Sequence, residues 1–113
     1  MSTETGKRAE DAVANYLQAH KFKIVDRNWK TKWCEVDIVA EKGKLMHFVE
    51  VKFRRSGQQG EGFDYVTRSK LRQMRFAADM WVHLHSWQGE YVLSAASVDG
   101  GSGAIEFIEQ VLE

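Results

Sequence analysis

The sequence contains a single cysteine, Cys34, which excludes an intramolecular disulfide and any cysteine-based zinc cluster. Its four histidines lack the HxxxH type of ligand spacing, so the chemistry of soft metal ions is not indicated. No apolar run approaches the length of about 18 residues that a membrane-spanning helix needs. The first residues carry neither a basic start nor an apolar stretch. We therefore expect no membrane span, no secretory signal and a cytoplasmic location.

The chain also lacks net charge, with 16 Lys and Arg against 16 Asp and Glu, but these charges are segregated along it. Residues 52–75 contain seven basic side chains and two acidic ones, whereas residues 76–113 contain six acidic side chains and no Lys or Arg. A concentrated basic segment predicts a local surface that binds anions. The alternative is an ordinary solvated helix face.

A chain of 113 residues with 43% hydrophobic and 28% charged content is typical of one globular domain, predicted here to span residues 1–113. Its patterns predict helices at 5–20 and 66–86, strands at 21–30, 34–40, 45–53 and 90–98, a surface loop at 54–65, and a C-terminal strand running into a helical turn. The order α-β-β-β-α-β predicts an α/β fold in which helices flank a mixed sheet.

The segment EKGK, residues 41–44, predicts a tight turn with Lys42 and Gly43 as its central residues. In that register Glu35 faces Glu50, and Asp37 faces Phe48. Because side chains alternate along a strand, one face of this hairpin carries Glu35, Asp37, Glu50 and Lys52, while the other carries Val36, Ile38, Ala40, Leu45, Val49, Val51 and Phe53.

Asp37 and Glu50 are diagonal neighbours in this hairpin, with Cβ atoms at most about 7–8 Å apart. Adjacent carboxylates repel one another unless a cation screens them, and Mg²⁺ prefers such oxygen ligands together with retained water. Lys52, on the same face, would place an ammonium group beside an incoming phosphate. The alternative is that this row is the solvated face of an antiparallel strand pair.

Four segments, TGKRAEDAVANYL, RNWKTKWCEVDIVA, FVEVKFRRS and VTRSK, resemble the YraN family of small bacterial proteins over about residues 5–85. That family is similar to archaeal Holliday-junction resolvases of the restriction-endonuclease-like superfamily, whose site is the PD-(D/E)xK motif. The resemblance implies that Asp37, Glu50 and Lys52 form this motif. It also implies that Glu10 assists in binding a metal ion. The family usually has glycine at the position of Cys34, and commonly an aspartate near the position of Ser94.

The function expected from this resemblance is metal-dependent hydrolysis of phosphodiesters in structured or non-specific DNA. Asp37 and Glu50, with Glu10 and the Val51 carbonyl, would hold Mg²⁺ or Mn²⁺, while Lys52 would orient water. The residues expected to hold flanking phosphates are Arg54, Arg55, Arg68 and Lys70. Trp29, Trp33 and Trp87 would either stack on bases or pack in the core.

Two other functions remain open. A module of the same fold could bind nucleic acid, or a DNA-processing complex, without cutting it. A protein-interaction domain could instead use the acidic C-terminal third, with Glu106, Glu109 and Glu113, to meet a basic partner. A homodimer is a further alternative, as in the resolvases, although no stretch of the sequence identifies an interface.

Overall fold

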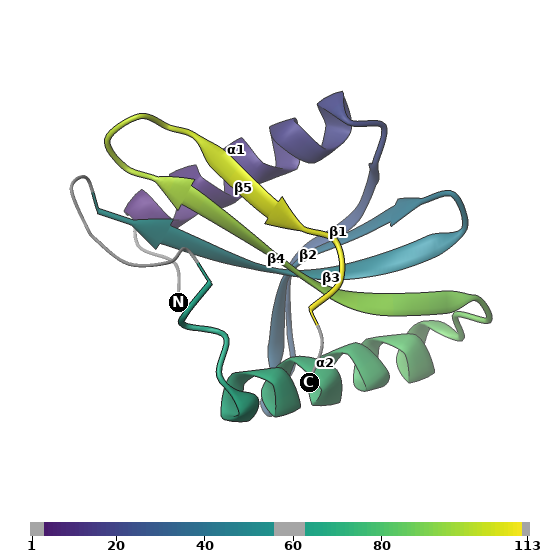
Figure 1. The fold of residues 1–113 in the computed structure, drawn as a ribbon. Helices are drawn as coiled ribbons and strands as arrows, with labels where there is room; N and C mark the ends of the chain where they lie inside the picture. The colour runs from purple at the N-terminus through teal and green to yellow at the C-terminus, as the bar shows by residue number, and fades with distance from the viewer. Residues whose placement is uncertain (1–3, 56–62, 112–113) are drawn as a thin grey trace.

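A computed structural model describes residues 4–55 and 63–111 of the chain, which form two helices and a five-stranded sheet. The elements are α1 (Glu4–Ala19), β1 (Lys23–Lys30), β2 (Glu35–Lys42), β3 (Leu45–Arg54), α2 (Arg68–His85), β4 (Glu90–Asp99) and β5 (Ile105–Ile108). The strands follow their sequence order across the sheet. Among the strands of the described residues, β3 and β4 are the one parallel pair, and α2 lies between them in the chain (Figure 1). The predicted α/β fold with a mixed sheet is therefore confirmed.

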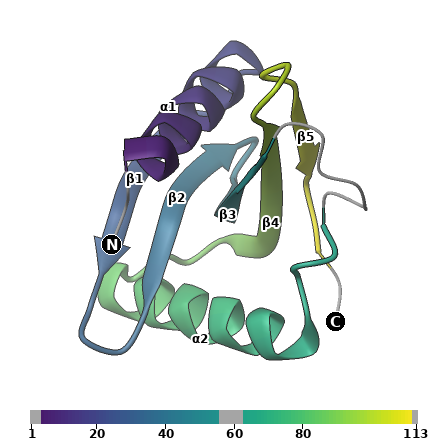
Figure 2. The same cartoon turned by 90° about the vertical axis from the view of Figure 1, so that its left-hand side faces the viewer.

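The sheet is covered on both faces, by α1 on one side and α2 on the other (Figure 2). The α1 face buries Val13, Leu17, Ile38, Ala40 and Val49, among others. The α2 face buries Val39, Met46, Phe48, Met74 and Trp81, among others. The alternative of a solvated strand face is thus wrong for the part of the row that contains Met46 and Phe48, because α2 covers these residues. At the end of the row, Glu35 and Lys52 are exposed.

The turn between β2 and β3 differs from the predicted one by one position. Lys42 pairs with Leu45, so the central residues are Gly43 and Lys44, with φ angles of 59° and 69°. Positive φ at both central positions is typical of a type I′ turn. The correction moves each cross-strand partner by two residues, which by itself keeps the side-chain faces. Glu50, rather than Phe48, therefore follows as the partner of Asp37 when the register is continued. Val36, however, was predicted to share a face with Ile38 and Ala40, and it packs instead on the α2 side of the sheet, whereas those two residues pack on the α1 side.

The N-terminus of α2 is fixed by Thr67, the residue that precedes its first helical residue. The Thr67 hydroxyl oxygen accepts a hydrogen bond from the Lys70 N–H at 3.1 Å. This cap satisfies one backbone donor of the first helical turn and sets the start of the helix. It therefore fixes where Ser69, Lys70 and Arg72 emerge, on the first turns of α2.

The C-terminal prediction was wrong in part, since residues 109–111 form no helical turn after β5. The backbone N–H of Val111 instead donates to the Leu93 carbonyl at 2.7 Å, which ties this end to β4. Of the predicted loop, Arg54 belongs to β3, and residues 56–62 lie outside the described part. No helix in residues 4–55 and 63–111 is both long and apolar enough to cross a lipid bilayer.

Candidate active site

The candidate site lies where β2 and β3 separate. Their pairing ends at Ile38 and Val49, although β2 begins at Glu35 and β3 continues to Arg54 beside β4. Just beyond the last pair, the Asp37 carboxylate accepts a hydrogen bond from the Val51 N–H at 2.8 Å. The side chain of Asp37 thus continues the connection between the two strands and is held in place by it.

Burial is the main reason that the pKa of Asp37 rises to about 7. The negative charges of Glu50, Glu10 and Glu35 raise this pKa further, while the hydrogen bond from Val51 opposes the rise. Desolvation and like charges both disfavour the ionised form of a carboxyl group. A nearby cation would reverse this effect, because it favours the ionised carboxylate.

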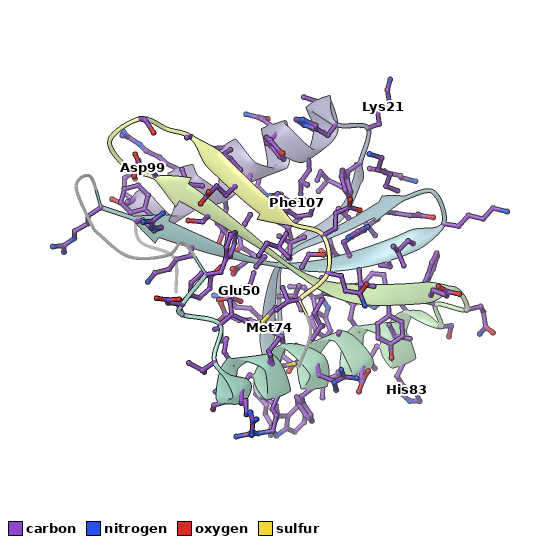
Figure 3. The ribbon with its side chains drawn as sticks, viewed as in Figure 1. Lys21, Glu50, Met74, His83, Asp99 and Phe107 are labelled. Carbon is purple, nitrogen blue, oxygen red and sulfur yellow. The ribbon has the colours of Figure 1, made fainter. Side chains whose placement is uncertain are left out.

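Glu10 and Glu50 reach Asp37 from different elements. Glu10 lies on α1, and only 6% of its surface is exposed. Glu50 lies on β3 and points into the space between the sheet and α2, near Met74 (Figure 3). The fold therefore brings the three predicted acidic residues into one region, close enough for their charges to act on Asp37.

Lys70 is the cation that contacts Glu50. Its Nζ atom lies 2.9 Å from the Glu50 Oε2 atom, and both side chains are partly buried. Lys70 was predicted to hold a flanking phosphate. In the structure it lies closer to the active-site acids than that role requires, because it pairs with Glu50. A partly desolvated ion pair of this kind is harder to break than an exposed one.

Lys52 is exposed, and its Nζ atom lies 5.9 Å from the centre of the Tyr65 ring. No ion pair joins it to Asp37 or Glu50 in the described part of the chain. Tyr65 is a residue that sequence reasoning missed. Its buried hydroxyl has no hydrogen-bond partner among the described residues, and burial, Glu50 and Asp37 all raise its pKa. Its place after a polar loop gave no signal of this proximity.

The remaining predicted phosphate contacts lie at different places in the fold. Arg54 Nη1 lies 3.9 Å from Glu106 Oε1, which places this arginine beside β5. Arg55 and Arg68 are exposed. Among the predicted basic residues, Lys70 contacts Glu50 directly.

The predicted ligands are oxygen donors, the kind that a hard divalent ion prefers. Across residues 4–55 and 63–111, no three Asp, Glu, His or Cys side chains are grouped closely enough to ligate one ion. Mg²⁺, however, commonly takes only one or two carboxylates and keeps several waters. Asp37 and Glu50 provide two carboxylates of this kind. Burial and like charges disfavour the ionised form of Asp37, and a bound cation would favour it again. The donor set therefore fits a hard divalent ion.

Two positions at which the sequence departs from the resembling family are structural. Ser94 on β4 is fully buried, and its hydroxyl contacts the His47 ring at 3.0 Å and donates to the Glu109 carbonyl. Cys34 is half-buried, with its Sγ atom 3.8 Å from Met80 Sδ. Neither residue belongs to the acidic region, so neither takes part in the candidate site.

A solved structure shares this fold. The chain is similar to Hjc, a Holliday junction resolvase from Archaeoglobus fulgidus, with a TM-score of 0.54 and 18% identity over 92% of this chain and 76% of that one. The fold is thus the restriction-endonuclease-like one. Residues 9–100 match the family described as Uncharacterised protein family UPF0102, and the chain belongs to that family. This confirms the YraN resemblance, since the two family names denote the same family.

Similar sequences come from several bacteria. A UPF0102 protein of Wolinella succinogenes is 35% identical over 111 residues, which is 98% of both chains. One from Renibacterium salmoninarum is 39% identical over 84 residues, covering 74% of this chain and 71% of that one. One from Rhodococcus jostii is 43% identical over 77 residues, covering 68% of this chain and 65% of that one. The matched part thus spans about two thirds of the latter two relatives.

Proposed function

We propose that this protein is a nuclease that hydrolyses phosphodiester bonds in structured or non-specific DNA, with Mg²⁺ or Mn²⁺ held by Asp37 and Glu50. The observation that carries the proposal is the buried Asp37 carboxyl group, whose pKa is raised by burial and by the charge of Glu50. A buried carboxyl group that is unfavourable to ionise is typical of a functional site, and a bound cation would favour its ionised form. The likeness of the fold to that of a Holliday junction resolvase supports the choice of DNA.

In the proposed reaction, a water oxygen bonds to phosphorus and the bond from phosphorus to one bridging oxygen breaks. The water loses a proton to solvent, and the leaving oxygen gains one, so the products are a phosphate monoester and a free hydroxyl. When bound, the divalent ion supplies polarisation of the phosphate and makes water a better nucleophile at neutral pH.

The protein's own groups act around this reaction. Asp37, fixed by the Val51 N–H, and Glu50 would be the two carboxylate ligands of the ion, with the Val51 carbonyl as a further oxygen donor. Glu10 is not grouped closely enough with them to be a third direct ligand, so we assign it a role through water bound to the ion. Lys52 orients the water and offsets charge that develops on the phosphate oxygens, an effect commonly worth a few kcal/mol. Arg54, Arg55, Arg68 and Lys70 hold flanking phosphates, which position DNA without reading its sequence.

The test is cleavage of labelled flapped, branched and single-stranded DNA in Mg²⁺ or Mn²⁺. Asp37→Asn and Lys52→Ala are each expected to lower the cleavage rate by about 100-fold or more, as for other preorganised charged groups. Glu41→Gln, which removes a carboxylate from the far end of β2, is the matched control and should cleave like wild type. Cleavage that survives both site substitutions would show that the reaction occurs elsewhere.

One observation favours a second candidate, a DNA-binding module that does not cut. Lys70 already neutralises Glu50, so the acidic region is partly satisfied without a metal ion. Thermal unfolding distinguishes the two candidates. Mn²⁺ should raise the melting temperature of wild type but not of Asp37→Asn if the ion binds here. Equal melting temperatures with and without Mn²⁺, together with salt-dependent DNA binding, would favour the module. A homodimer stays a prediction.

A further inference from the structure

A groove of about 730 Å³ runs from Glu50 along the N-terminal half of α2, and the turn at residues 31–34 forms its other wall. This volume is within the range of about 300–1,000 Å³ that is typical of ligand sites. One face of α2 lines the groove, since its residues there are spaced three and four apart: Ser69, Arg72, Gln73 and Phe76. The groove is therefore formed by two rigid walls and opens from the candidate active site.

Two large aromatic side chains on opposite walls are unusually exposed. Trp33 has 68% of its surface exposed, and Phe76 has 50%. By contrast, Trp29 and Trp87 pack against the core between the sheet and α2. From the sequence, Trp29, Trp33 and Trp87 could each either stack on a base or pack in the core. Of these three, Trp33 is the one that lines the groove. An exposed indole presents a flat apolar surface on which a base can stack.

The turn that presents Trp33 is held by its own hydrogen bonds. The Thr31 hydroxyl oxygen accepts from the Trp33 N–H at 3.0 Å and from the Cys34 N–H at 3.2 Å. The Thr31 N–H donates to the Cys34 carbonyl at 2.9 Å. Side-chain bonds of this kind fix a turn without strand pairing. The indole is therefore displayed on a preorganised turn, which lowers the entropy cost of binding.

Cations lie beside these aromatic rings. Lys70 and Arg72 line the groove from α2, and Lys32 lines it from the turn, with its Nζ atom 5.0 Å from the centre of the Trp33 ring. Two acids, Glu35 and Glu50, lie at the groove wall nearest β2 and β3. A ligand that matches the cations and the exposed rings of the groove carries both repeated negative charges and flat rings. An unpaired nucleotide strand has this chemistry.

We propose that the groove binds a single-stranded segment of DNA, with one base stacked on Trp33 and its phosphates beside Arg72 and Lys70. The strand then leads directly to Glu50. The choice of DNA rests on the proposed function, whereas the single-stranded form rests on the exposed ring and its cations. A paired base would be unavailable to Trp33, because both of its faces are covered within the duplex.

The test is fluorescence anisotropy at low salt in EDTA, with a labelled 12-mer of thymidine and an abasic strand of the same length. Wild type should bind the thymidine strand more tightly than the abasic strand and more tightly than a 12-base-pair duplex. Trp33→Ala should weaken thymidine binding by about 5- to 150-fold, the range for one stacked base. Its affinity for the abasic strand should stay within about twofold of wild type. Trp33→Phe should restore most of the lost affinity.

Leu84→Ala is the matched control, because Leu84 is an apolar side chain of α2 with 60% exposure that does not line the groove. It should bind both strands like wild type. Equal binding of the two strands by wild type, tighter binding of the duplex, or no effect of Trp33→Ala would each overturn the inference. Thermal unfolding checks whether Trp33→Ala is folded, and Trp33→Phe tests the same position with an aromatic ring retained.

This experiment separates the groove from the proposed hydrolysis. In EDTA no divalent ion is available, so binding is measured without cleavage. Asp37→Asn should keep the preference for thymidine over abasic DNA even when it cleaves nothing. Binding that depends on Trp33 in a protein without nuclease activity would support the groove and refute the hydrolysis. Cleavage that depends on Asp37, with binding indifferent to Trp33, would do the reverse.

Discussion

At the scale of single residues, Asp37 combines a fixed position with an unfavourable charge. Its hydrogen bond to the Val51 N–H holds the carboxyl group where burial and three neighbouring acids oppose ionisation. Functional residues often carry a cost of this kind, because the environment that a reaction needs is not the one that folding favours. The free energy needed to ionise Asp37 in the folded protein can be measured through the pH dependence of stability.

The pKa of Asp37 lies above its unfolded value of 3.8, at about 7. The folded protein therefore keeps this proton over a range in which the unfolded chain has lost it, so stability falls as pH rises from about 4 to about 7. Asp37→Asn removes the effect and keeps an oxygen that can accept from the Val51 N–H. Since one pKa unit corresponds to about 1.36 kcal/mol and the pKa rises by about 3, the variant should be more stable at pH 8 by up to about 4 kcal/mol.

Urea denaturation of both proteins at pH 4 and pH 8, without divalent ions, checks this prediction. The advantage of the variant should be small at pH 4 and largest at pH 8. Asp64→Asn controls for the loss of one exposed carboxylate, and it should not show the same growth with pH. An Asp37→Asn protein less stable than wild type at pH 8 would contradict the electrostatic account.

At the scale of elements, periodicity was enough to predict both helices and the first four strands. Each has a strong apolar pattern, and the structure moves their ends by a few residues at most. The C-terminal segment was harder, because its short apolar run fits a strand and a helical turn equally well. Its conformation is decided by pairing of β5 with β4 and by the Val111 hydrogen bond, which are contacts distant in sequence.

The site was predictable as far as it depends on neighbouring strands. Alternation along β2 and β3 placed Asp37, Glu50 and Lys52 on one face, whatever the exact turn. The family resemblance, not periodicity, added Glu10. The Glu50–Lys70 ion pair and the proximity of Tyr65 could not be read from the sequence, since both depend on how α2 and the segment before it pack against β3.

The turn between β2 and β3 leads to a prediction about stability, because both of its central residues have positive φ angles. Gly43 has a φ of 59°, and Gly43→Ala should lower the free energy of unfolding by about 1 kcal/mol, because a Cβ atom disfavours this conformation. Lys44 has a φ of 69° and is already strained, so Lys44→Gly should raise the free energy by about 0.5 kcal/mol. Thermal denaturation of both variants checks the opposite signs. Destabilisation by both would show that the turn has another conformation.

At the scale of the whole molecule, the segregation of charge along the sequence becomes a segregation in space. The basic segment supplies the first half of α2 beside the groove, whereas β4 and β5 carry no Lys or Arg. A protein of zero net charge can therefore still attract DNA to one region. Association through such a region should depend steeply on salt.

Charge reversal of a basic residue near the groove tests this dependence. Arg68→Glu should weaken binding of the thymidine 12-mer and lower the slope of log affinity against log salt concentration by about 0.7 or more, the value for one lost contact with single-stranded DNA. Arg8→Glu is the control, because Arg8 lies on α1, on the opposite side of the sheet. Titrations at several salt concentrations provide both slopes. Identical slopes for the two variants would mean that only total charge matters.

The ion pair between Glu50 and Lys70 links the two proposed sites through a single exchange of partners. A cation that binds Glu50 competes with the Lys70 ammonium for this carboxylate, and a released Lys70 becomes available to a phosphate in the groove. Occupation of one site would thus prepare the other, and thermodynamic reciprocity requires that a strand drawing Lys70 away leaves Glu50 more receptive to a metal ion. Substrate and metal ion would then bind cooperatively, because each of them favours the separation of Lys70 from Glu50.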